Sequence, residues 1–260
     1  MTGNVNRRVL FTFFALLLLT GCAHEEGIVL SEKDMPPAQA LYEKLTADPA
    51  PGKTLTGILH VTATVPGGRY TFKIAAAAKK PDCLRMEDLS VIGLPDFMLT
   101  ASGSEVRVFL PRTGEFLVGS ETSDHVLRIF PPTVKPSDLV ALLYGQPPAL
   151  PHSVKSLKGS VDGNRYRLDV YAGGNWAQSL WVEPGTGHLA RLEVADGSGK
   201  TAYSARLQDF TETGPRAVPG RIEIETEGMG RIRFSLRVAD MEFVEGDNDP
   251  DFFLLKPPVK

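Results

Sequence analysis

The sequence predicts a mainly β protein, built on an antiparallel sheet with a few short helices. Apolar and polar residues alternate with a period of two through most segments between residues 53 and 244, as they do in half-buried strands. The chain also holds 25 Gly and 20 Pro, which supply many turns. Only three short stretches, residues 38–45, 124–130 and 137–145, combine apolar residues with signals for the start or end of a helix.

The first 21 residues are typical of a secretory signal peptide. Arg7 and Arg8 precede an apolar block, residues 9–19, which is too short to span a bilayer comfortably. The block ends in Leu19-Thr20-Gly21-Cys22, which resembles the lipobox of bacterial lipoproteins. The resemblance implies cleavage after Gly21 and lipidation of Cys22, and several acyl chains hold a protein durably on a membrane. Ala23 follows the cysteine, which by the same resemblance favours the outer membrane, periplasmic side.

The remaining chain divides into a tether, residues 22–35, and a single domain, residues 36–260. The formal net charge is −3, and removal of the signal peptide takes away two arginines and no acid. Such a balance argues against nucleic acid as a partner and against docking on anionic lipid through charge. With Cys22 lipidated, Cys83 is the only other cysteine, so no intrachain disulfide is expected.

The elements of the first half follow from their patterns. A helix over residues 38–45 begins after Pro36-Pro37 and ends before Asp48-Pro49. Strands are expected around residues 53–65, 70–78, 84–86, 97–101, 106–110 and 116–118, with turns at residues 66–68 and 111–114.

Two helices interrupt the strands in mid-chain. One is expected over residues 124–130, and the other begins at Ser137 and ends at Gly145, with prolines on both sides. The second is too short to be stable alone, so its apolar side must be docked on something apolar. Strands resume near residue 153 and continue through residues 166–170, 180–182, 190–194 and 203–207.

The last hairpin has a register that both of its faces support. If the loop 228–230 is symmetric, Glu225 lies opposite Arg233 and Glu227 opposite Arg231, while Ile224 lies opposite Phe234. Ile222 then faces Leu236. The apolar tail, residues 252–258, is expected either to add an edge strand or to pack under the sheet.

The sequence lacks the motifs of an enzyme. It has no Gly-x-Ser-x-Gly elbow and no phosphate loop, and its five histidines do not have the spacing of metal ligands. The acidic turn at residues 247–251 has Phe252 where a calcium loop needs glycine. We therefore expect no enzymatic activity, no metal and no cofactor. The apolar face of the sheet either closes on itself as a filled core or leaves a hollow for an apolar ligand, and periodicity does not separate these alternatives.

Four segments resemble the LolA/LolB superfamily of lipoprotein-localisation factors. They are residues 89–95, residues 108–116, the helix at residues 138–145 and the closing Phe252-Phe253-Leu254-Leu255-Lys256-Pro257. The resemblance implies an incomplete, strongly curved antiparallel β-barrel with a helical lid over a hydrophobic cavity. It also implies that the cavity binds acyl chains of lipoproteins or another hydrophobic ligand, and that a periplasmic carrier protein is a partner.

The resemblance and the strand pattern together give the candidate site residues. The predicted cavity lining is Leu59, Val61, Phe72, Ile74, Leu99, Phe109, Ile224, Phe234 and Leu236. Ile92 and Leu94 flank Gly93 where LolB has an exposed apolar residue that helps to insert cargo into the membrane. Here Ile92 replaces the usual Leu and Pro95 follows, so the alternative is that these residues belong to the core.

A second hypothesis comes from a different functional class. A structural or assembly lipoprotein would use the edge of its sheet to bind an envelope protein complex and would have no ligand cavity. An exposed edge strand and a filled barrel would favour this alternative.

Overall fold

One antiparallel sheet of 13 strands forms the frame of the part of the chain that the structure describes. The structure is a computed structural model that describes residues 30–48, 50–90, 94–121, 123, 133–150, 155–226, 231–245 and 251–258. Its strands are β1 (Thr54–Val65), β2 (Gly68–Lys79), β3 (Cys83–Asp88), β4 (Met98–Ser102), β5 (Glu105–Leu110), β6 (Glu115–Ser120), β7 (Lys155–Asp162), β8 (Arg165–Ala172), β9 (Asn175–Val182), β10 (Leu189–Ala195), β11 (Thr201–Thr213), β12 (Arg216–Thr226) and β13 (Ile232–Val244).

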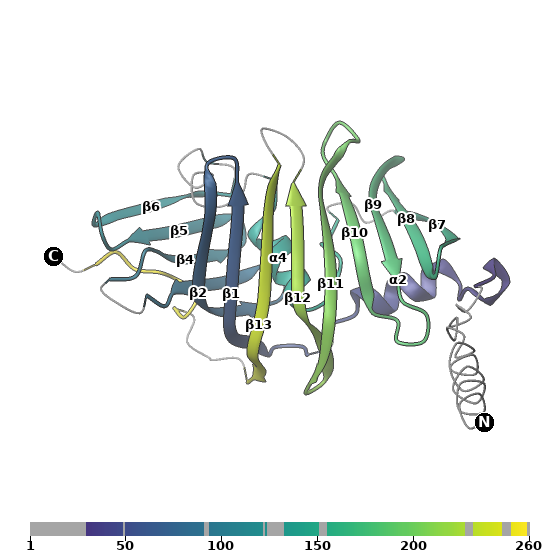
Figure 1. Cartoon of the computed structure of the whole chain (residues 1–260), viewed down its shortest axis with the longest axis horizontal. Coiled ribbons are helices and arrows are strands. Elements are labelled where there is room, and N and C mark those ends of the chain that lie inside the picture. The colour runs from purple at the N-terminus through teal and green to yellow at the C-terminus, as the bar shows by residue number, and fades with distance from the viewer. Residues whose placement is uncertain are drawn as a thin grey trace, which may run out of the picture.

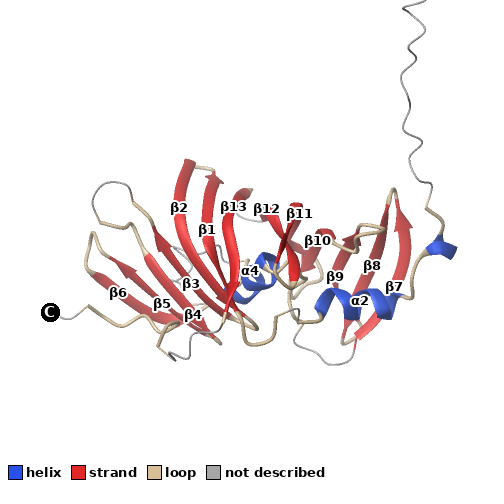
Figure 2. Ribbon diagram, turned by 90° about the horizontal axis from the view of Figure 1, so that it is seen from below, coloured by secondary structure: helices blue, strands red, loops and turns tan. Residues whose placement is uncertain are grey.

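The strand order explains how the two halves of the chain form one sheet. From edge to edge the order is β6-β5-β4-β3-β2-β1-β13-β12-β11-β10-β9-β8-β7, so the first and the last strands meet in the middle. The sheet is strongly curved, and it stays open with β6 and β7 at its edges (Figures 1 and 2). The predicted fold class, a mainly β protein with an incomplete curved barrel, is confirmed.

Two helices lie on the concave side of this sheet (Figure 2). Helix α2 (Ala38–Thr46) covers the β7 side and buries Leu41, Tyr42 and Leu45. Helix α4 (Pro136–Leu143) lies at the centre and buries every residue except Ser137. A 3₁₀ turn, η2 (Glu32–Asp34), precedes α2. None of the helices among the described residues is long and apolar enough to cross a membrane.

Helix α4 is fixed to both halves of the sheet. At its start, Asp138 Oδ2 accepts a hydrogen bond of 2.9 Å from the Tyr203 hydroxyl of β11. Just beyond its end, the Tyr144 hydroxyl donates to the carbonyl oxygens of Ala78 (3.1 Å) and Lys53 (3.2 Å) on the β1–β2 side. Gly145 ends the helix at φ 67°, a left-handed conformation that glycine adopts without strain. The predicted start at Ser137 is wrong by one residue, because Pro136 already occupies the first turn.

The register predicted for the last hairpin is confirmed. Ile222 lies opposite Leu236, Ile224 opposite Phe234, and Glu225 opposite Arg233. Glu227 and the loop 228–230 lie outside the described residues, and Arg231 pairs with Glu225 at 2.9 Å. Beyond Arg221 the pairing of β12 with β13 stops, although β12 continues beside β11 and β13 beside β1. The sheet is therefore split along this seam at one end.

The tail resolves one alternative that the sequence left open. Residues 251–258 form no strand and cross the convex face of β3–β5. The Leu255 N–H donates to Thr100 Oγ1 at 3.1 Å, and the Arg107 guanidinium donates to the Leu255 carbonyl oxygen at 3.2 Å. Thr100 is buried by this contact although its side chain faces away from the core. The tail therefore packs on the sheet as a strap.

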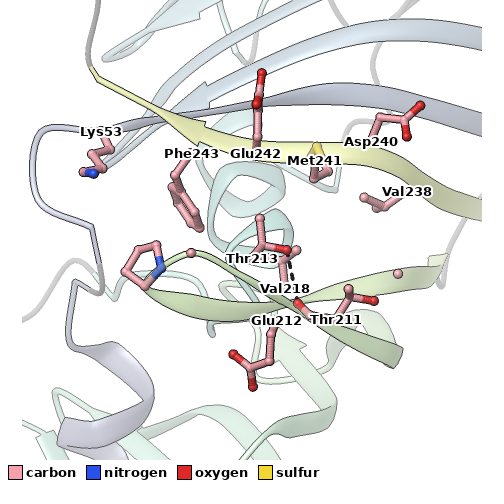
Figure 3. A pocket seen from close by; sticks show the side chains of 13 residues that line it. Lys53, Thr211, Glu212, Thr213, Val218, Val238, Asp240, Met241, Glu242 and Phe243 are labelled. Atoms are coloured by element: carbon pink, nitrogen blue, oxygen red, sulfur yellow. Dashed lines mark hydrogen bonds between the residues drawn. The ribbon is translucent and has the colours of Figure 1, made fainter.

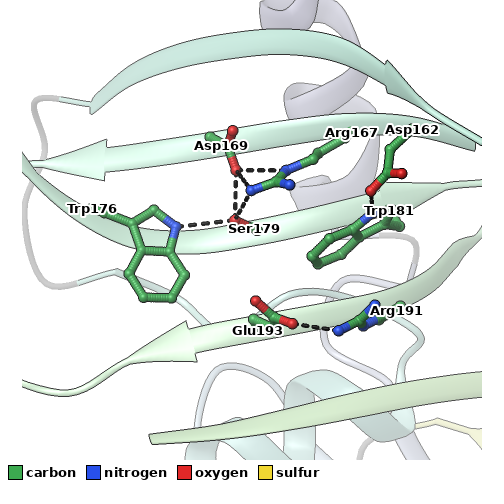
Figure 4. Close-up of polar contacts among 8 residues, drawn as sticks. All are labelled: Asp162, Arg167, Asp169, Trp176, Ser179, Trp181, Arg191 and Glu193. Carbon is green, nitrogen blue, oxygen red and sulfur yellow. Dashed lines mark hydrogen bonds and ion pairs between the residues drawn. The ribbon is translucent and has the colours of Figure 1, made fainter. Parts of the chain in front are cut away.

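Outward arginines are neutralised within their own strands over much of the convex face. On β8, Arg167 pairs with Asp169 at 2.9 Å, and on β10 Arg191 pairs with Glu193 (Figure 4). Both guanidinium groups lie against the ring of Trp181, at 5.1 and 4.4 Å from its centroid. These ion pairs and cation–π contacts stabilise this part of the sheet.

Several sequence-based predictions fall outside the described residues. They are the signal peptide, the lipidation site Cys22, Ile92, the helix at residues 124–130 and most of the acidic turn. Part of the predicted tether is described, and it contacts the domain. Leu30 and Met35 pack on the core, and the Tyr166 hydroxyl donates to the Asp34 carbonyl oxygen at 3.1 Å.

Candidate hydrophobic cavity and its surroundings

An apolar cavity of about 330 Å³ lies between the concave face of the sheet and helix α4. Most of the predicted lining residues contribute to it: Val61, Phe72, Ile74, Leu99, Ile224, Phe234 and Leu236. They come from β1, β2, β4, β12 and β13, strands that are distant in sequence and adjacent in the sheet. Its volume falls at the lower end of the range of about 300–1,000 Å³ that is typical of small-molecule sites.

The alternation of the strands explains why these side chains converge. Val61 lies opposite both Phe72 and Leu236, and all three point to the concave side. Their chain neighbours, such as Thr62 and Ser235, point to the convex side and line a different, shallow hollow. The period-two pattern therefore identified the correct face for these residues.

Two of the predicted lining residues do not belong to the cavity. Phe109 lies on the opposite face of β5, because Val108 and Leu110 on either side of it point inward. Leu110 takes the predicted place of Phe109. Leu59 does point inward, but it is fully buried beside Ile74 and Val238 in the packed core.

The sequence analysis missed seven further lining residues: Ala63, Met86, Asp96, Phe97, Leu110, Val134 and Leu139. Leu139 was recognised as part of an apolar helix side, but sequence gave no indication of what that side faces. Ala63 was part of the same inward pattern as Val61, and its small side chain leaves space in the cavity. Val134 is joined to the site only by the docking of α4.

The start of α4 carries the most perturbed carboxyl group near the cavity. Asp138 is buried, and this burial raises its pKa to about 6, while the hydrogen bond from Tyr203 and the nearby Lys135 act in the opposite direction. Burial also raises the pKa of Tyr203. Leu139, the next residue, lines the cavity. The position of α4 over the cavity is therefore linked to a titratable contact.

The loop between β3 and β4 lies at the rim of the cavity. Asp96 and Phe97 line the cavity, and the Asp96 N–H donates to Asp88 Oδ2 at 3.0 Å. The Asp96 carboxylate pairs with Arg112 at 2.7 Å. Leu94 is 59% exposed, one of the most exposed large apolar side chains described, so it is not part of the core. Its predicted companion Ile92 lies outside the described residues.

The β7–β11 half of the sheet has a filled core. Leu168, Val170, Leu180, Val182 and Leu189 have no exposed surface, and they share one core cluster with Leu41, Tyr42 and Leu45 of helix α2. Gln178 is also fully buried and donates to the Pro148 carbonyl oxygen at 2.8 Å. The sequence left a filled core and an apolar hollow as alternatives. The β7–β11 half of the sheet has the filled core, and the other half has the hollow.

A second hollow, of about 520 Å³, lies where β12 and β13 separate (Figure 3). It is bounded by the β11–β12 hairpin and by residues 238–243 of β13, with Glu212, Asp240 and Glu242 among its polar groups. Its mixed lining suits an apolar chain less well than the cavity beside α4 does. Among the described residues, no group of His, Cys, Asp and Glu side chains is placed to hold a metal ion.

Comparison with known proteins adds the fold family. No family model and no curated protein matches the sequence. A LolA superfamily protein from Nitrosomonas europaea matches the structure with a TM-score of 0.61 at 15% identity, over 85% of this chain and 99% of that chain. The chain has a LolA/LolB-like fold.

Two other solved structures share this LolA/LolB-like fold. A DUF1329 family protein from Desulfovibrio piger matches with a TM-score of 0.55 at 13% identity, over 84% of this chain and 98% of that chain. A domain assigned to outer membrane lipoprotein sorting, from Vibrio parahaemolyticus, matches with a TM-score of 0.50 at 10% identity, over 83% of this chain and 94% of that chain. The resemblance predicted from the sequence is thus confirmed at the level of the fold.

Proposed function

We propose that this protein is a lipid-anchored carrier that binds acyl chains, or another hydrophobic ligand, in the cavity beside α4. The observation that carries the proposal is the apolar lining: 13 of the 14 residues around the cavity are apolar, and the exception, Asp96, has its carboxylate paired with Arg112. An apolar ligand that enters such a site removes apolar surface from water without leaving a polar group unpaired.

The mechanism is non-covalent. The acyl chains of a client enter between the strands and α4, the helix shifts, and the client leaves for the membrane. Cys22 would hold the protein on the periplasmic face of the outer membrane, and the exposed Leu94 at the cavity rim would contact the lipid. A periplasmic carrier protein would deliver the client.

Native mass spectrometry tests the proposal on the chain that starts at Ala23. All described contacts lie within residues 30–258, so this chain contains the complete described fold. Purified without detergent, it should carry lipid or acylated species and should take up an apolar fluorescent probe. A bare protein mass together with no probe uptake would contradict the carrier function.

Variants locate the binding to the cavity. Phe234→Glu and Ile224→Glu place a carboxylate in the lining and should abolish probe uptake, while Ala63→Phe should do so by filling the space with apolar atoms. Ser235→Glu is the matched control, because it adds the same charge to the same strand on the opposite face. Unfolding curves establish that each variant is folded. Equal uptake by all four variants would show that the probe binds elsewhere.

The open edges of the sheet support a second candidate function. Among the described residues, strands β6 and β7 each pair with one neighbouring strand and form the edges of the sheet, and sheet edges are a template for binding another chain. An assembly lipoprotein would use such an edge to bind an envelope protein. Retention of an envelope protein by the chain from Ala23, lost when Pro is introduced at Leu117 of β6 and kept in Phe234→Glu, would favour this candidate.

A further inference from the structure

The convex face of β2, β1 and β13 carries a regular grid of polar side chains directly behind the cavity. The cross-strand pairs give three rows of three residues. One row is Lys73, His60 and Arg237; the middle row is Thr71, Thr62 and Ser235; and the third is Arg69, Thr64 and Arg233. From the usual strand spacing and rise, the grid measures roughly 10 Å by 13 Å.

None of the nine grid positions is a carboxylate, although the chain as a whole is acidic. Lys73, Arg69 and Arg237 are exposed and have no ion-pair partner among the described residues. Arg233 has only a 3.4 Å contact with Glu225 on the neighbouring strand. The local charge of this basic grid is therefore opposite in sign to that of the whole protein.

The arrangement departs from the pattern of the remaining convex face. On β3, β5, β8 and β10 an outward arginine has a carboxylate two residues away on its own strand, as in the pairs Arg107–Glu105 and Arg167–Asp169. Here Arg237 on β13 lies directly opposite Arg221 on β12, although Arg221 also pairs with Asp209 of β11 at 3.3 Å. Like charges that are directly opposite destabilise a sheet. Because Arg237 has no ion-pair partner among the described residues, its place opposite Arg221 carries a cost in stability, which indicates a binding function.

The chemistry of the grid suits phosphate. Guanidinium groups donate paired N–H groups to phosphate oxygens, and the hydroxyls of Thr62, Thr64 and Ser235 add further donors between the two basic rows. Seven of the nine grid residues, all except Lys73 and Thr71, line one shallow hollow of about 660 Å³. A shallow, open surface of this kind fits the headgroups of a bilayer better than a single small ion, which is normally enclosed by its ligands.

An exposed apolar side chain, Leu89, lies at the edge of the basic grid. The Leu89 N–H donates to the Lys73 carbonyl oxygen at 2.6 Å, and Leu89 is 36% exposed. Tyr70, next to Arg69, is 52% exposed but points to the concave side, because it lies opposite Ala63 of the cavity lining, and Leu94, 59% exposed, lies at the cavity rim. Binding at a membrane interface combines buried apolar groups with cations that contact anionic headgroups. Both components are present here, side by side.

We infer that the basic grid binds the phosphate groups of anionic phospholipids and so holds the cavity-bearing strands against the membrane surface. The inference deepens the proposed carrier function and rests on it for its biological role. The net charge of the whole chain is negative and argues against docking on anionic lipid. The net charge does not show that several cations lie together on one part of the convex face.

Co-sedimentation with vesicles tests the inference with the chain from Ala23, which lacks Cys22. This chain should bind vesicles that contain phosphatidylglycerol and should not bind vesicles of phosphatidylcholine alone. Replacing Arg69, Lys73 and Arg237 by Gln should weaken binding by about fivefold for each cation and roughly 100-fold together. The matched control replaces Lys33, Lys158 and Lys200 by Gln, which changes the net charge equally and should leave binding nearly unchanged.

The outcomes separate this inference from the carrier function. Equal weakening in both triple variants, or equal binding to neutral vesicles, would overturn it. Release of the wild-type chain by inorganic phosphate at matched ionic strength, or equally tight binding of duplex DNA, would show an anion site without preference for lipid and would also overturn it. Uptake of the apolar probe is measured in parallel, and the grid variant should keep it. If the wild-type chain takes up no probe, that result contradicts the carrier function and not the binding of phospholipid by the grid.

Discussion

The hydroxyl of Tyr203 on β11 donates a 2.9 Å hydrogen bond to Asp138 Oδ2 at the start of α4. Both residues are buried, and this contact joins the helix over the cavity to the half of the sheet whose core is filled. The carboxyl group also accepts from the Lys135 N–H at 3.4 Å, so one side chain both caps the helix and docks it. The anchor of α4 on the β11 side therefore contains a titratable group, Asp138.

The raised pKa of Asp138 predicts a decrease in stability as pH rises. Because its folded-state pKa of about 6 exceeds the ordinary value of 3.8, the folded protein retains a proton that the unfolded chain has lost between these values. The free energy of unfolding should therefore fall between about pH 4 and pH 6, by at most about 3 kcal/mol from this group. Asp138→Asn removes the titration and keeps an acceptor for Tyr203.

Urea unfolding of both proteins at pH 4 and pH 7 measures this effect. Between pH 4 and pH 7 the unfolding free energy of the wild type should fall by more than that of Asp138→Asn. A Tyr203→Phe variant should lose more stability at pH 7 than at pH 4, because the hydroxyl stabilises the ionised form. A difference that is the same at both pH values would contradict the assignment.

Leu94 is expected to act in release to the membrane and not in binding. Its exposed side chain lies two residues before Asp96 at the cavity rim but does not line the cavity. Leu94→Glu removes an apolar contact with lipid worth about 2 kcal/mol, and so should slow transfer of a bound apolar probe to vesicles by roughly 30-fold. Probe uptake in the absence of vesicles should not change.

Stopped-flow transfer of the probe to vesicles provides this measurement. Val118→Glu is the control, since Val118 is also exposed, at 46%, but lies on the edge strand β6. Equal transfer rates for wild type and Leu94→Glu would remove this residue from the proposed mechanism.

Gly57 is required by a close approach between β1 and β13. The β1–β13 register shifts next to it, and Asp240 on β13 has a positive φ of 54°. A Cβ at position 57 would lie 2.3 Å from Met241 Sδ and 3.0 Å from Met241 Cα. Gly57→Ala should therefore destabilise the protein by about 1–3 kcal/mol.

A double variant isolates the cause. Met241→Ala removes the sulfur and should restore part of the stability in the Gly57→Ala background, whereas the contact with the backbone remains. Gly197→Ala, where a Cβ would meet nothing within 4 Å, is the control and should change the melting temperature little. Absence of coupling between Gly57→Ala and Met241→Ala in unfolding curves would show that the strain lies elsewhere.

The sequence alone determined the strand pattern, the mainly β class and the register of the β12–β13 hairpin, whereas the open barrel was implied by the family resemblance. These properties are local or depend on neighbouring strands, and a period of two with matched pairs on both faces leaves one consistent solution for residues 222–236. The inward direction of Val61, Phe72, Ile74 and Phe234 followed from the same rule. The prediction for Phe109 is wrong, because its neighbours Val108 and Leu110 both point inward and Phe109 therefore points to the opposite face of β5.

Only the tertiary structure decided which inward residues enclose a cavity. Leu59 and Val61 share one strand and one face, yet Leu59 is fully packed and Val61 lines the cavity, because α4 covers a limited part of the concave side. The basic grid likewise required the pairing of β2, β1 and β13, since Lys73 and Arg237 are far apart in sequence and separated by one strand in the sheet. Strands that are far apart in sequence bring these residues together when they pair, and no local pattern in the sequence predicts that pairing.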